Sequence, residues 1–207
     1  MMVKSRGPLW HQKQKKQGVI PKGLTGLDKE ATWSYSHADG WIYGHGVFSL
    51  VSHKRSVLGL FQWMPNSAHE ANRLKAQIVQ FTGLVKKVCM DSKADDQKLY
   101  KLLRGEHHMQ LLTTVRKGMD KTPARQEMSR QMKRPRNQKI YRQRATTVEP
   151  MQGVVKELFE LETCWMRGDA ANRWLFAAMG IAVQMAQHRA YRCGTSTWNI
   201  KEEVLGL

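Results

Sequence analysis

Short apolar segments rich in aromatic and β-branched residues recur along the chain, and this pattern predicts strands. Residues 40–53 form the densest of these segments, and 56–64 follows after a short His-Lys-Arg break. Such spacing is typical of a hairpin. The apolar stretches 84–90 and 109–115 predict a third and a fourth strand.

Helical periodicity occupies the stretches between and after these strands. Ser67 and Glu70 have the spacing of a capping box, which predicts that a helix begins there. The apolar face of this helix would consist of Ala71, Leu74, Ile78 and Phe81. Segments 95–104, 148–165 and 169–192 predict further helices. The resulting order of strand, strand, helix, strand, helix, strand indicates a mixed α/β sheet flanked by helices.

The chain divides into three parts by composition. Residues 1–40 are polar, basic and rich in turn signals, so we expect mostly loop there. Residues 41–192 would form the α/β domain, and 193–207 a C-terminal tail. Within the domain, 116–144 contains two prolines and about eleven Lys and Arg against two acids. This segment is either a flexible loop or an excursion from the core.

The charge of the whole chain supports a role of that segment in binding a polyanion. Lys and Arg number 34 against 17 Asp and Glu, the formal net charge is +17, and the sequence pI is about 10.1. This excess favours a nucleic-acid partner over a membrane, because no basic amphipathic helix with a clean apolar face is evident. The alternative is a basic surface that is merely solvated.

Other sequence features exclude several classes of protein. No apolar run is long enough to span a bilayer, and the N-terminal residues lack the apolar core of a signal peptide, so we expect a cytoplasmic protein. The 3 cysteines are odd in number and include no Cys-x-x-Cys pair. They therefore argue against a disulfide framework and against a zinc site.

The tightest acidic cluster lies at the end of the predicted strand 84–90. Asp95 and Asp96 open the following helix, where carboxylates commonly cap free N–H groups. Asp91 directly follows the strand, and the carboxyl ends of strands are where open α/β sheets build their sites. Asp91 is therefore a candidate metal ligand, with a simple turn residue as the alternative.

Glu149 is the second candidate, at the start of the helix predicted after the basic segment. Lys156 lies seven residues further on, on the same helix face, so the pair could hold a metal ion and a phosphate together. The alternative is a helix N-terminal glutamate with a solvated lysine. Carboxylates of this kind hold Mg²⁺, which supports phosphodiester chemistry.

These residues also carry a resemblance to a known family. The segment "YRQRATTVEPMQGVVKELF" resembles the Tyr–Arg–Glu–Lys signature of DDE transposases of bacterial insertion sequences, although four residues rather than three separate Arg144 from Glu149. The segment "VCMDSKADDQKLYKLL" resembles the stretch around the family's second aspartate. The stretch "LFQWMPNSAHEANRL" is similar to the one that precedes it in the family.

The resemblance implies an RNase H-like fold for 41–192 and a transposase activity that cuts and joins DNA phosphodiesters. It implies Mg²⁺ or Mn²⁺ as cofactor, held by Asp91 and Glu149, and transposon ends and target DNA as partners. A homodimer is left open. The DNA-contacting residues would be Lys133, Arg134, Arg136, Arg142, Arg144 and Lys156.

The family's first aspartate has no counterpart in this sequence. It precedes a Lys-x-Arg-Gly-Pro-x-Trp-His segment, which is matched here from Lys4 to His11, so the aspartate would fall before Met1. Asp28 and Asp39 lie in loop-like sequence and are poor substitutes. The resemblance therefore predicts a truncated chain without the first strand and with little or no activity.

Two readings without catalysis compete with the transposase. The first is a basic nucleic-acid-binding protein in which 116–144 carries the binding. The second is a structural RNA-associated protein, which is disfavoured because no RRM-like or KH-like motif is present. Metal dependence separates a transposase from both.

Overall fold

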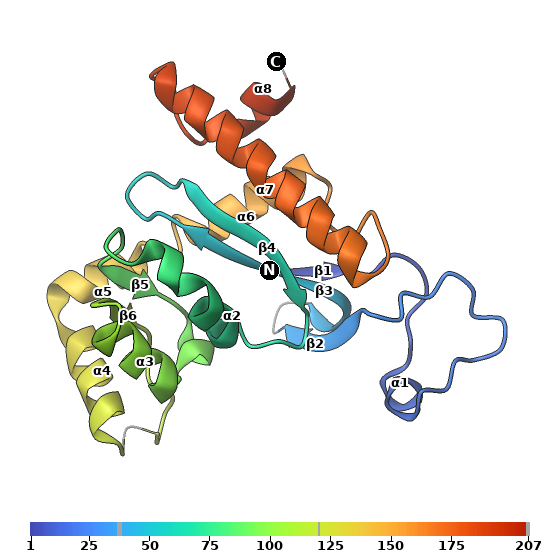
Figure 1. Cartoon of the computed structure of the whole chain (residues 1–207), viewed down its shortest axis with the longest axis horizontal. Helices are drawn as coiled ribbons and strands as arrows, with labels where there is room; N and C mark the ends of the chain where they lie inside the picture. Colours follow the sequence, from blue (N-terminus) through green and yellow to red (C-terminus); the bar gives the residue numbers. More distant parts are fainter. Residues whose placement is uncertain (37–38, 120, 206–207) are drawn as a thin grey trace. The chain divides into compact units, whose positions relative to one another are not determined.

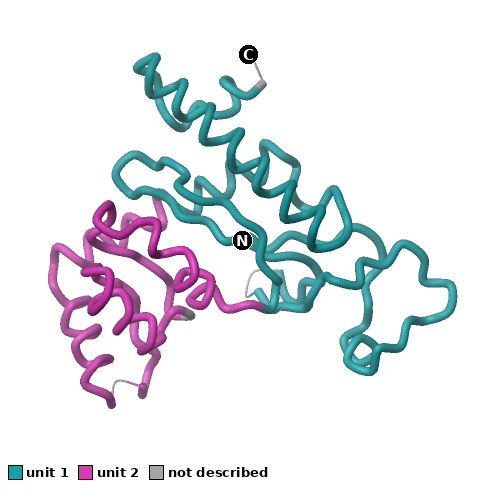
Figure 2. The backbone as a smooth tube through the Cα atoms, viewed as in Figure 1, with its two compact units in different colours: residues 1–67, 147–207 teal, residues 68–146 magenta. Residues whose placement is uncertain are grey.

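The computed structural model describes residues 1–36, 39–119 and 121–205. The chain forms two compact units, which are coloured separately in Figure 2. Unit 1 comprises residues 1–67 and 147–207, and unit 2 comprises residues 68–146. Each unit has its own small sheet and its own helices, so each is described by itself. Helices and strands together confirm the predicted mixed α/β class.

The sheet of unit 1 is built around one long strand, β3 (Gly40–Val51) (Figure 1). Gly44, within β3, is opposite a residue of β1 (Met2–Lys4) on one side and a residue of β2 (Thr32–Ser36) on the other. Strand β4 (Leu58–Pro65) pairs with the remainder of β3 and follows β2 along the same edge. All three pairings are antiparallel, and the predicted hairpin of β3 and β4 is confirmed.

The core of unit 1 lies between this sheet and two helices. Helix α7 (Asp169–Arg192) packs on β4, and α6 (Val148–Leu158) adds side chains to the same cluster. A Cβ atom on Gly180 would lie 2.9 Å from the Cβ of Phe61, so glycine at this position permits the close approach of α7 to β4. The larger buried side chains of this core include Val47, Leu58, Phe61, Trp63, Met151, Phe176 and Val183.

Segments that the sequence assigned to loop and tail belong to unit 1. Residues 1–40 supply the strands β1 and β2 and the short helix α1 (Gln12–Gln17). At the other end, α8 (Ile200–Leu205) packs on α7, and Ile200 is buried in the core of the unit. Three-residue pairings such as that of β1 carry too short a pattern to be recognised in the sequence.

A buried carboxylate joins three distant parts of unit 1. One oxygen of Asp28 accepts a hydrogen bond from Nε2 of His45 at 2.8 Å and another from the N–H of Gly168 at 3.1 Å. The other oxygen accepts from backbone N–H groups two and three positions further along the chain. The indole N–H of Trp63 donates to Nδ1 of His45, so the second ring nitrogen carries the proton that Asp28 receives.

These bonds set the acid–base behaviour of Asp28. Burial raises its pKa, but the hydrogen bonds from His45, Gly168 and Ala31 outweigh that effect, so the net pKa lies below the ordinary value of 3.8. The stabilising contribution of this carboxylate is therefore fully present above the unfolded-state pKa. It is lost as pH falls through the folded-state pKa.

Unit 2 contains a parallel pair of strands, β5 (Lys87–Cys89) and β6 (Gln110–Leu112). Helix α3 (Gln97–Gly105) connects them and buries Leu99 and Leu103. Helix α2 (Glu70–Gln77) precedes the pair and continues into a 3₁₀ turn that buries Ile78. The predicted strand and helix positions are confirmed, although both strands are shorter than expected.

The predicted capping box at Ser67 is wrong. Helix α2 begins at Glu70 with His69 in the cap position, and no side chain accepts a hydrogen bond there. The N–H of Ser67 instead donates to the hydroxyl of Thr32 at 3.0 Å. Ser67 is thus used to fasten the end of β4 beside β2 within unit 1.

The basic segment 116–144 is largely helical, which corrects its interpretation as a flexible loop. It contains α4 (Pro123–Lys133) and α5 (Pro135–Arg142). Each proline occupies the first turn of its helix, where its missing N–H costs nothing. Arg134 both ends α4 and begins α5, with an extended backbone at φ −66° and ψ 127°.

None of the helices in the described ranges combines the length and apolar character needed to cross a membrane.

Replacing Asp28 with Ala is expected to lower the free energy of unfolding of unit 1 by about 2–6 kcal/mol, because it leaves the donors of His45 and Gly168 unsatisfied at about 1–3 kcal/mol each. All 7 tryptophans lie in unit 1, so tryptophan fluorescence during urea unfolding follows this unit selectively. Asp39→Ala is the control, since Asp39 is exposed.

A second measurement tests the charge itself. Asp28→Asn keeps the shape of the side chain but cannot ionise, so the stability difference from the unchanged protein should shrink as pH falls below about 4. A difference that is equal at pH 7 and at pH 3 would contradict the assigned role of the carboxylate.

Candidate metal ligands and nucleic-acid interface

Asp91 lies at the carboxyl end of the parallel strand pair in unit 2, as its sequence position predicts. Its backbone carbonyl accepts a hydrogen bond from the hydroxyl of Thr113, the residue that follows β6, at 2.5 Å. The N–H of Ala94 also donates to this carbonyl at 3.1 Å. Two strand ends therefore fix the backbone of Asp91, while its side chain is half-buried.

Asp96 has the capping role that the sequence predicts. Its carboxylate accepts hydrogen bonds from the backbone N–H groups of Lys98 and Leu99 at 2.7 and 3.1 Å. The ammonium group of Lys75 on α2 lies 2.5 Å from its other oxygen. Burial raises the pKa of Asp96, but these hydrogen bonds and the charge of Lys75 lower it by more than burial raises it, so the net shift of the pKa is downward.

Asp95 does not cap the helix, which corrects the expectation for that residue. Its carboxylate is fully buried and lies 2.8 Å from Nε of Arg125 on α4. It also accepts the backbone N–H of Arg116 at 3.2 Å. Asp95 therefore ties both the start of the basic segment and α4 to the body of unit 2.

Further hydrogen bonds hold the basic segment in place. The amide of Gln97 donates to the hydroxyl of Thr122 at 2.8 Å. The ammonium group of Lys87 on β5 donates to the buried side chain of Asn137 on α5 at 2.6 Å. Because these ties reach both helices, the cations of the segment are held on a defined surface rather than on a solvated loop.

The predicted DNA-contacting cations of unit 2 lie on this surface. Lys133, Arg134, Arg136 and Arg142 are exposed. Arg144 is half-buried, with its guanidinium 5.4 Å from the centre of the Tyr141 ring. An arginine held against an aromatic ring keeps its N–H donors in a fixed plane, which suits contact with phosphate oxygens.

Electrostatic effects link these cations to the strand that ends at Asp91. Burial and then the positive charges of Arg136 and Arg134 lower the pKa of Lys87 on β5. Burial raises the pKa of Cys89 on the same strand to about 11, and the nearby charge of Arg144 opposes this rise. The positive charges of Arg134, Arg136 and Arg144 therefore reach β5, and such a gathering of like charges favours an anionic partner.

Glu149 and Lys156 lie in unit 1, on α6. Glu149 occupies the first turn of the helix and is exposed, and Lys156 lies in the last turn. The ammonium group of Lys156 is 2.9 Å from the carboxylate of Glu162, so this cation already has an anionic partner. Asp91 and Glu149 belong to different units, and their convergence stays a prediction.

Neither of the downstream aspartates is suited to replace the family's first aspartate. Both oxygens of Asp28 are used by protein donors, and its side chain is 1% exposed. Asp39 is exposed in a turn and accepts a hydrogen bond from the hydroxyl of Ser36 at 3.2 Å. Within the described ranges, no three His, Cys, Asp or Glu side chains are grouped so that they could hold a metal ion.

Comparison with known families decides the class of protein. Residues 85–187 match the family described as Transposase DDE domain. The chain carries a transposase DDE domain. Its function is DNA transposition. The matched residues of this transposase domain include Asp91, the whole basic segment 116–144 and Glu149. Searches of curated proteins and of solved structures gave no match.

Sequence reasoning missed two residues that build the interface. Lys87 lies within the apolar strand β5, and Arg125 lies among many cations, so neither stands out by type or spacing. The structure shows that Lys87 fastens α5 and that Arg125 fastens α4. The burial of Asp95 is what demands a cationic partner, and that burial follows from the fold and not from the sequence.

Breaking the Asp95–Arg125 pair is expected to release α4 from unit 2. Asp95→Ala leaves the cation without its buried partner, so trypsin should cut within 116–144 faster than in the unchanged chain. The double variant Asp95→Ala/Arg125→Ala should be cut no faster than Asp95→Ala, because the two side chains act as one contact.

Glu127→Ala serves as the control, since its half-buried carboxylate pairs with the exposed side chains of Arg130 and Arg104, and ion pairs with exposed partners contribute little to stability. Equal cutting rates in Asp95→Ala and in Glu127→Ala would show that the buried pair does not anchor the helix.

Proposed function

We propose that this transposase domain cuts and joins DNA phosphodiesters, with Asp91 and Glu149 as ligands of a divalent metal, Mg²⁺ or Mn²⁺. The single observation that carries the proposal is the family match, which spans both residues. The position of Asp91 supports it, because its backbone is fixed at the carboxyl end of the parallel strand pair, where sites in α/β sheets are built. Carboxylate oxygens are the ligands that Mg²⁺ prefers.

The protein's own residues have distinct tasks in this proposal. A bound metal would supply charge stabilisation at the scissile phosphate. Asp91 and Glu149 would position it, and the cations along β5 would hold the DNA backbone beside Asp91. The third carboxylate of the family pattern is left unassigned, since Asp28 is committed to hydrogen bonds of unit 1.

The proposed partners are transposon ends and target DNA. The segment 116–144 would bind the phosphate backbone through Lys133, Arg134, Arg136, Arg142 and Arg144. Lys156 would add a contact from α6 once it exchanges Glu162 for phosphate. Joining two DNA ends also favours a homodimer, and action on bacterial DNA favours the cytoplasm.

Metal binding tests the two proposed ligands without requiring catalysis. Asp91→Ala and Glu149→Ala should each weaken Mn²⁺ binding to the DNA-bound chain by at least about tenfold, as loss of a ligand or its support typically does. Electron paramagnetic resonance of free Mn²⁺ measures this affinity directly. Asp39→Ala, a carboxylate outside the proposed site, should leave it unchanged.

The proposal requires that both variants weaken Mn²⁺ binding. Weaker Mn²⁺ binding in Asp91→Ala with no change in Glu149→Ala would show that the two carboxylates do not serve one metal site. In both variants the affinity for DNA measured without metal should stay the same, because the cations of 116–144 are untouched.

The DNA-binding role of the basic segment has its own signature. Each phosphate contact contributes about 0.9 to the slope of log affinity against log salt. Replacing Lys133, Arg134 and Arg136 together with Ala should therefore flatten the slope by up to about 3 units, measured by fluorescence anisotropy of a labelled duplex.

Lys98→Ala/Lys101→Ala on α3 is the control, because both lysines are exposed in the same unit but lie outside the segment. An unchanged slope in the triple variant would mean that the basic segment is only a solvated surface.

A further inference from the structure

A second group of cations lies on unit 1, in the turn between β3 and β4 and at the end of α7. The turn between β3 and β4 carries His53, Lys54 and Arg55, all of them exposed. The last turns of α7 carry His188 and Arg192, which are also exposed. These five residues are called the hairpin patch from here on.

Contacts within unit 1 hold the two halves of the patch together. The guanidinium of Arg55 lies 5.0 Å from the centre of the Tyr191 ring on α7. The hydroxyl of Thr197 donates to the backbone carbonyl of Arg55 at 2.7 Å. The buried side chain of Gln187 donates to the carbonyl of Ser56 at 2.9 Å. The turn is therefore fixed against the end of α7.

The charges of the patch are not neutralised by the protein. Arg189, on the same helix, lies 3.0 Å from the carboxylate of Glu203 and is left out of the patch for that reason. In the portion of the chain that the structure describes, Lys54, Arg55 and Arg192 form no ion pair with a carboxylate. Fixed, unpaired cations on one surface attract a polyanion.

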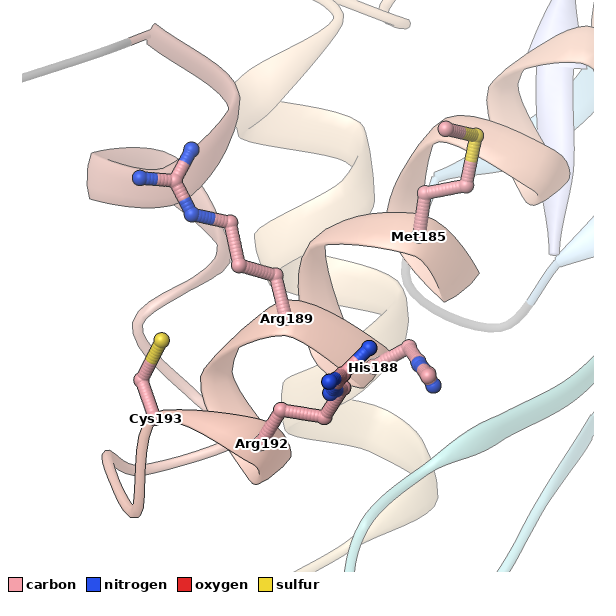
Figure 3. Close-up of a pocket in the computed structure, with 5 residues that line it drawn as sticks. All are labelled: Met185, His188, Arg189, Arg192 and Cys193. Atoms are coloured by element: carbon pink, nitrogen blue, oxygen red, sulfur yellow. The ribbon is translucent and has the colours of Figure 1, made fainter.

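The patch borders an open hollow at the end of α7. Figure 3 shows its lining residues, and its volume is about 570 Å³. His188 and Arg192 line it from the patch, and Cys193 lines it beside them. A ligand bound across the patch would therefore cover the thiol of Cys193.

We propose that the hairpin patch is a second DNA-binding surface, which contacts the phosphate backbone of duplex DNA independently of the segment 116–144. The proposal rests on the function in DNA transposition, which requires contact with more than one stretch of DNA. The arginines and the lysine supply charge-assisted hydrogen bonds to phosphate oxygens. The contacts carry no sequence information, so binding here is sequence-tolerant.

Cys193 provides a reporter that is specific for this surface. Burial raises the pKa of Cys89 to about 11 and that of Cys164 to about 12, so both remain protonated thiols near neutral pH. Cys193 is exposed and is therefore the thiol that N-ethylmaleimide reaches most readily. Mass spectrometry of samples taken at successive times identifies the labelled cysteine and gives the rate at which Cys193 reacts with N-ethylmaleimide.

The experiment measures this rate with and without a duplex. At a duplex concentration ten times the Kd, the DNA-free fraction falls to about one eleventh, so labelling of Cys193 should slow about tenfold. In Lys54→Ala/Arg55→Ala/Arg192→Ala, the duplex should no longer slow labelling relative to the DNA-free rate of the same variant. Tryptophan fluorescence checks that unit 1 of this variant is folded, and the expected spectrum is that of the unchanged protein.

Matched variants separate this surface from the others. Lys13→Ala/Lys16→Ala/Lys22→Ala removes three exposed lysines from the same unit and should leave protection by the duplex intact. Asp91→Ala and Glu149→Ala should also leave it intact, so failure of the proposed metal site does not affect this test. Lys133→Ala/Arg134→Ala/Arg136→Ala should still be protected once the duplex concentration is raised to its own saturation.

Three outcomes would overturn the proposal. The first is that Cys193 is labelled at the same rate with a saturating duplex as without it. The second is that the duplex still slows labelling in Lys54→Ala/Arg55→Ala/Arg192→Ala. The third is that Lys13→Ala/Lys16→Ala/Lys22→Ala loses protection as completely as that variant. Protection by vesicles of anionic lipid, or by single-stranded RNA, without protection by duplex DNA would assign the patch to a different partner and would also refute it.

Discussion

The carboxylate of Asp28 is the interaction on which the arrangement of unit 1 most depends. It joins a segment near residue 28 to the long strand β3 through His45 and to the start of α7 through Gly168, a residue 140 positions further on. The ring of His45 in turn accepts a hydrogen bond from Trp63, which connects β4 to the same group. Burying this charge is tolerable only because every one of its oxygens is matched by donors, so the parts that supply the donors must stay together.

The sequence allowed some elements to be predicted because their patterns are long. The hairpin of β3 and β4 and the 24-residue helix α7 each repeat their apolar period several times. The strand β1 has three residues, too few for a period to emerge, whereas the equally short β5 and β6 were predicted from the longer apolar runs that contain them. The proline at the start of α4 and the proline at the start of α5 resembled loop residues, since composition alone does not reveal that they occupy first helical turns.

In the candidate site, roles that depend on neighbours in the sequence were predictable, and roles that depend on distant residues were not. The capping role of Asp96 depends on its own neighbours in sequence, and it was predictable. The role of Asp95 depends on Arg125, thirty residues away, and a sequence without its fold gives no means of choosing that partner among so many cations. The place of Asp91 at a strand end was predictable from one apolar run, whereas the gathering of arginines along β5 requires the packing of α5.

The single residue between α4 and α5 has a consequence for the architecture of the basic segment. Pro135 disfavours a helical backbone at Arg134, and the extended backbone there prevents the two helices from merging into one continuous helix. In a continuous helix, successive side chains would rotate by about 100° and cations would spread around the whole circumference. Because the break at Arg134 interrupts this rotation, Arg136 and Arg142 on α5 do not follow the helical positions of α4, on which Lys133 lies. Pro135 thus keeps α4 and α5 as two separate helices, and the contacts of Asn137 with Gln131 and with Lys87 then fix the orientation in which α5 presents its arginines.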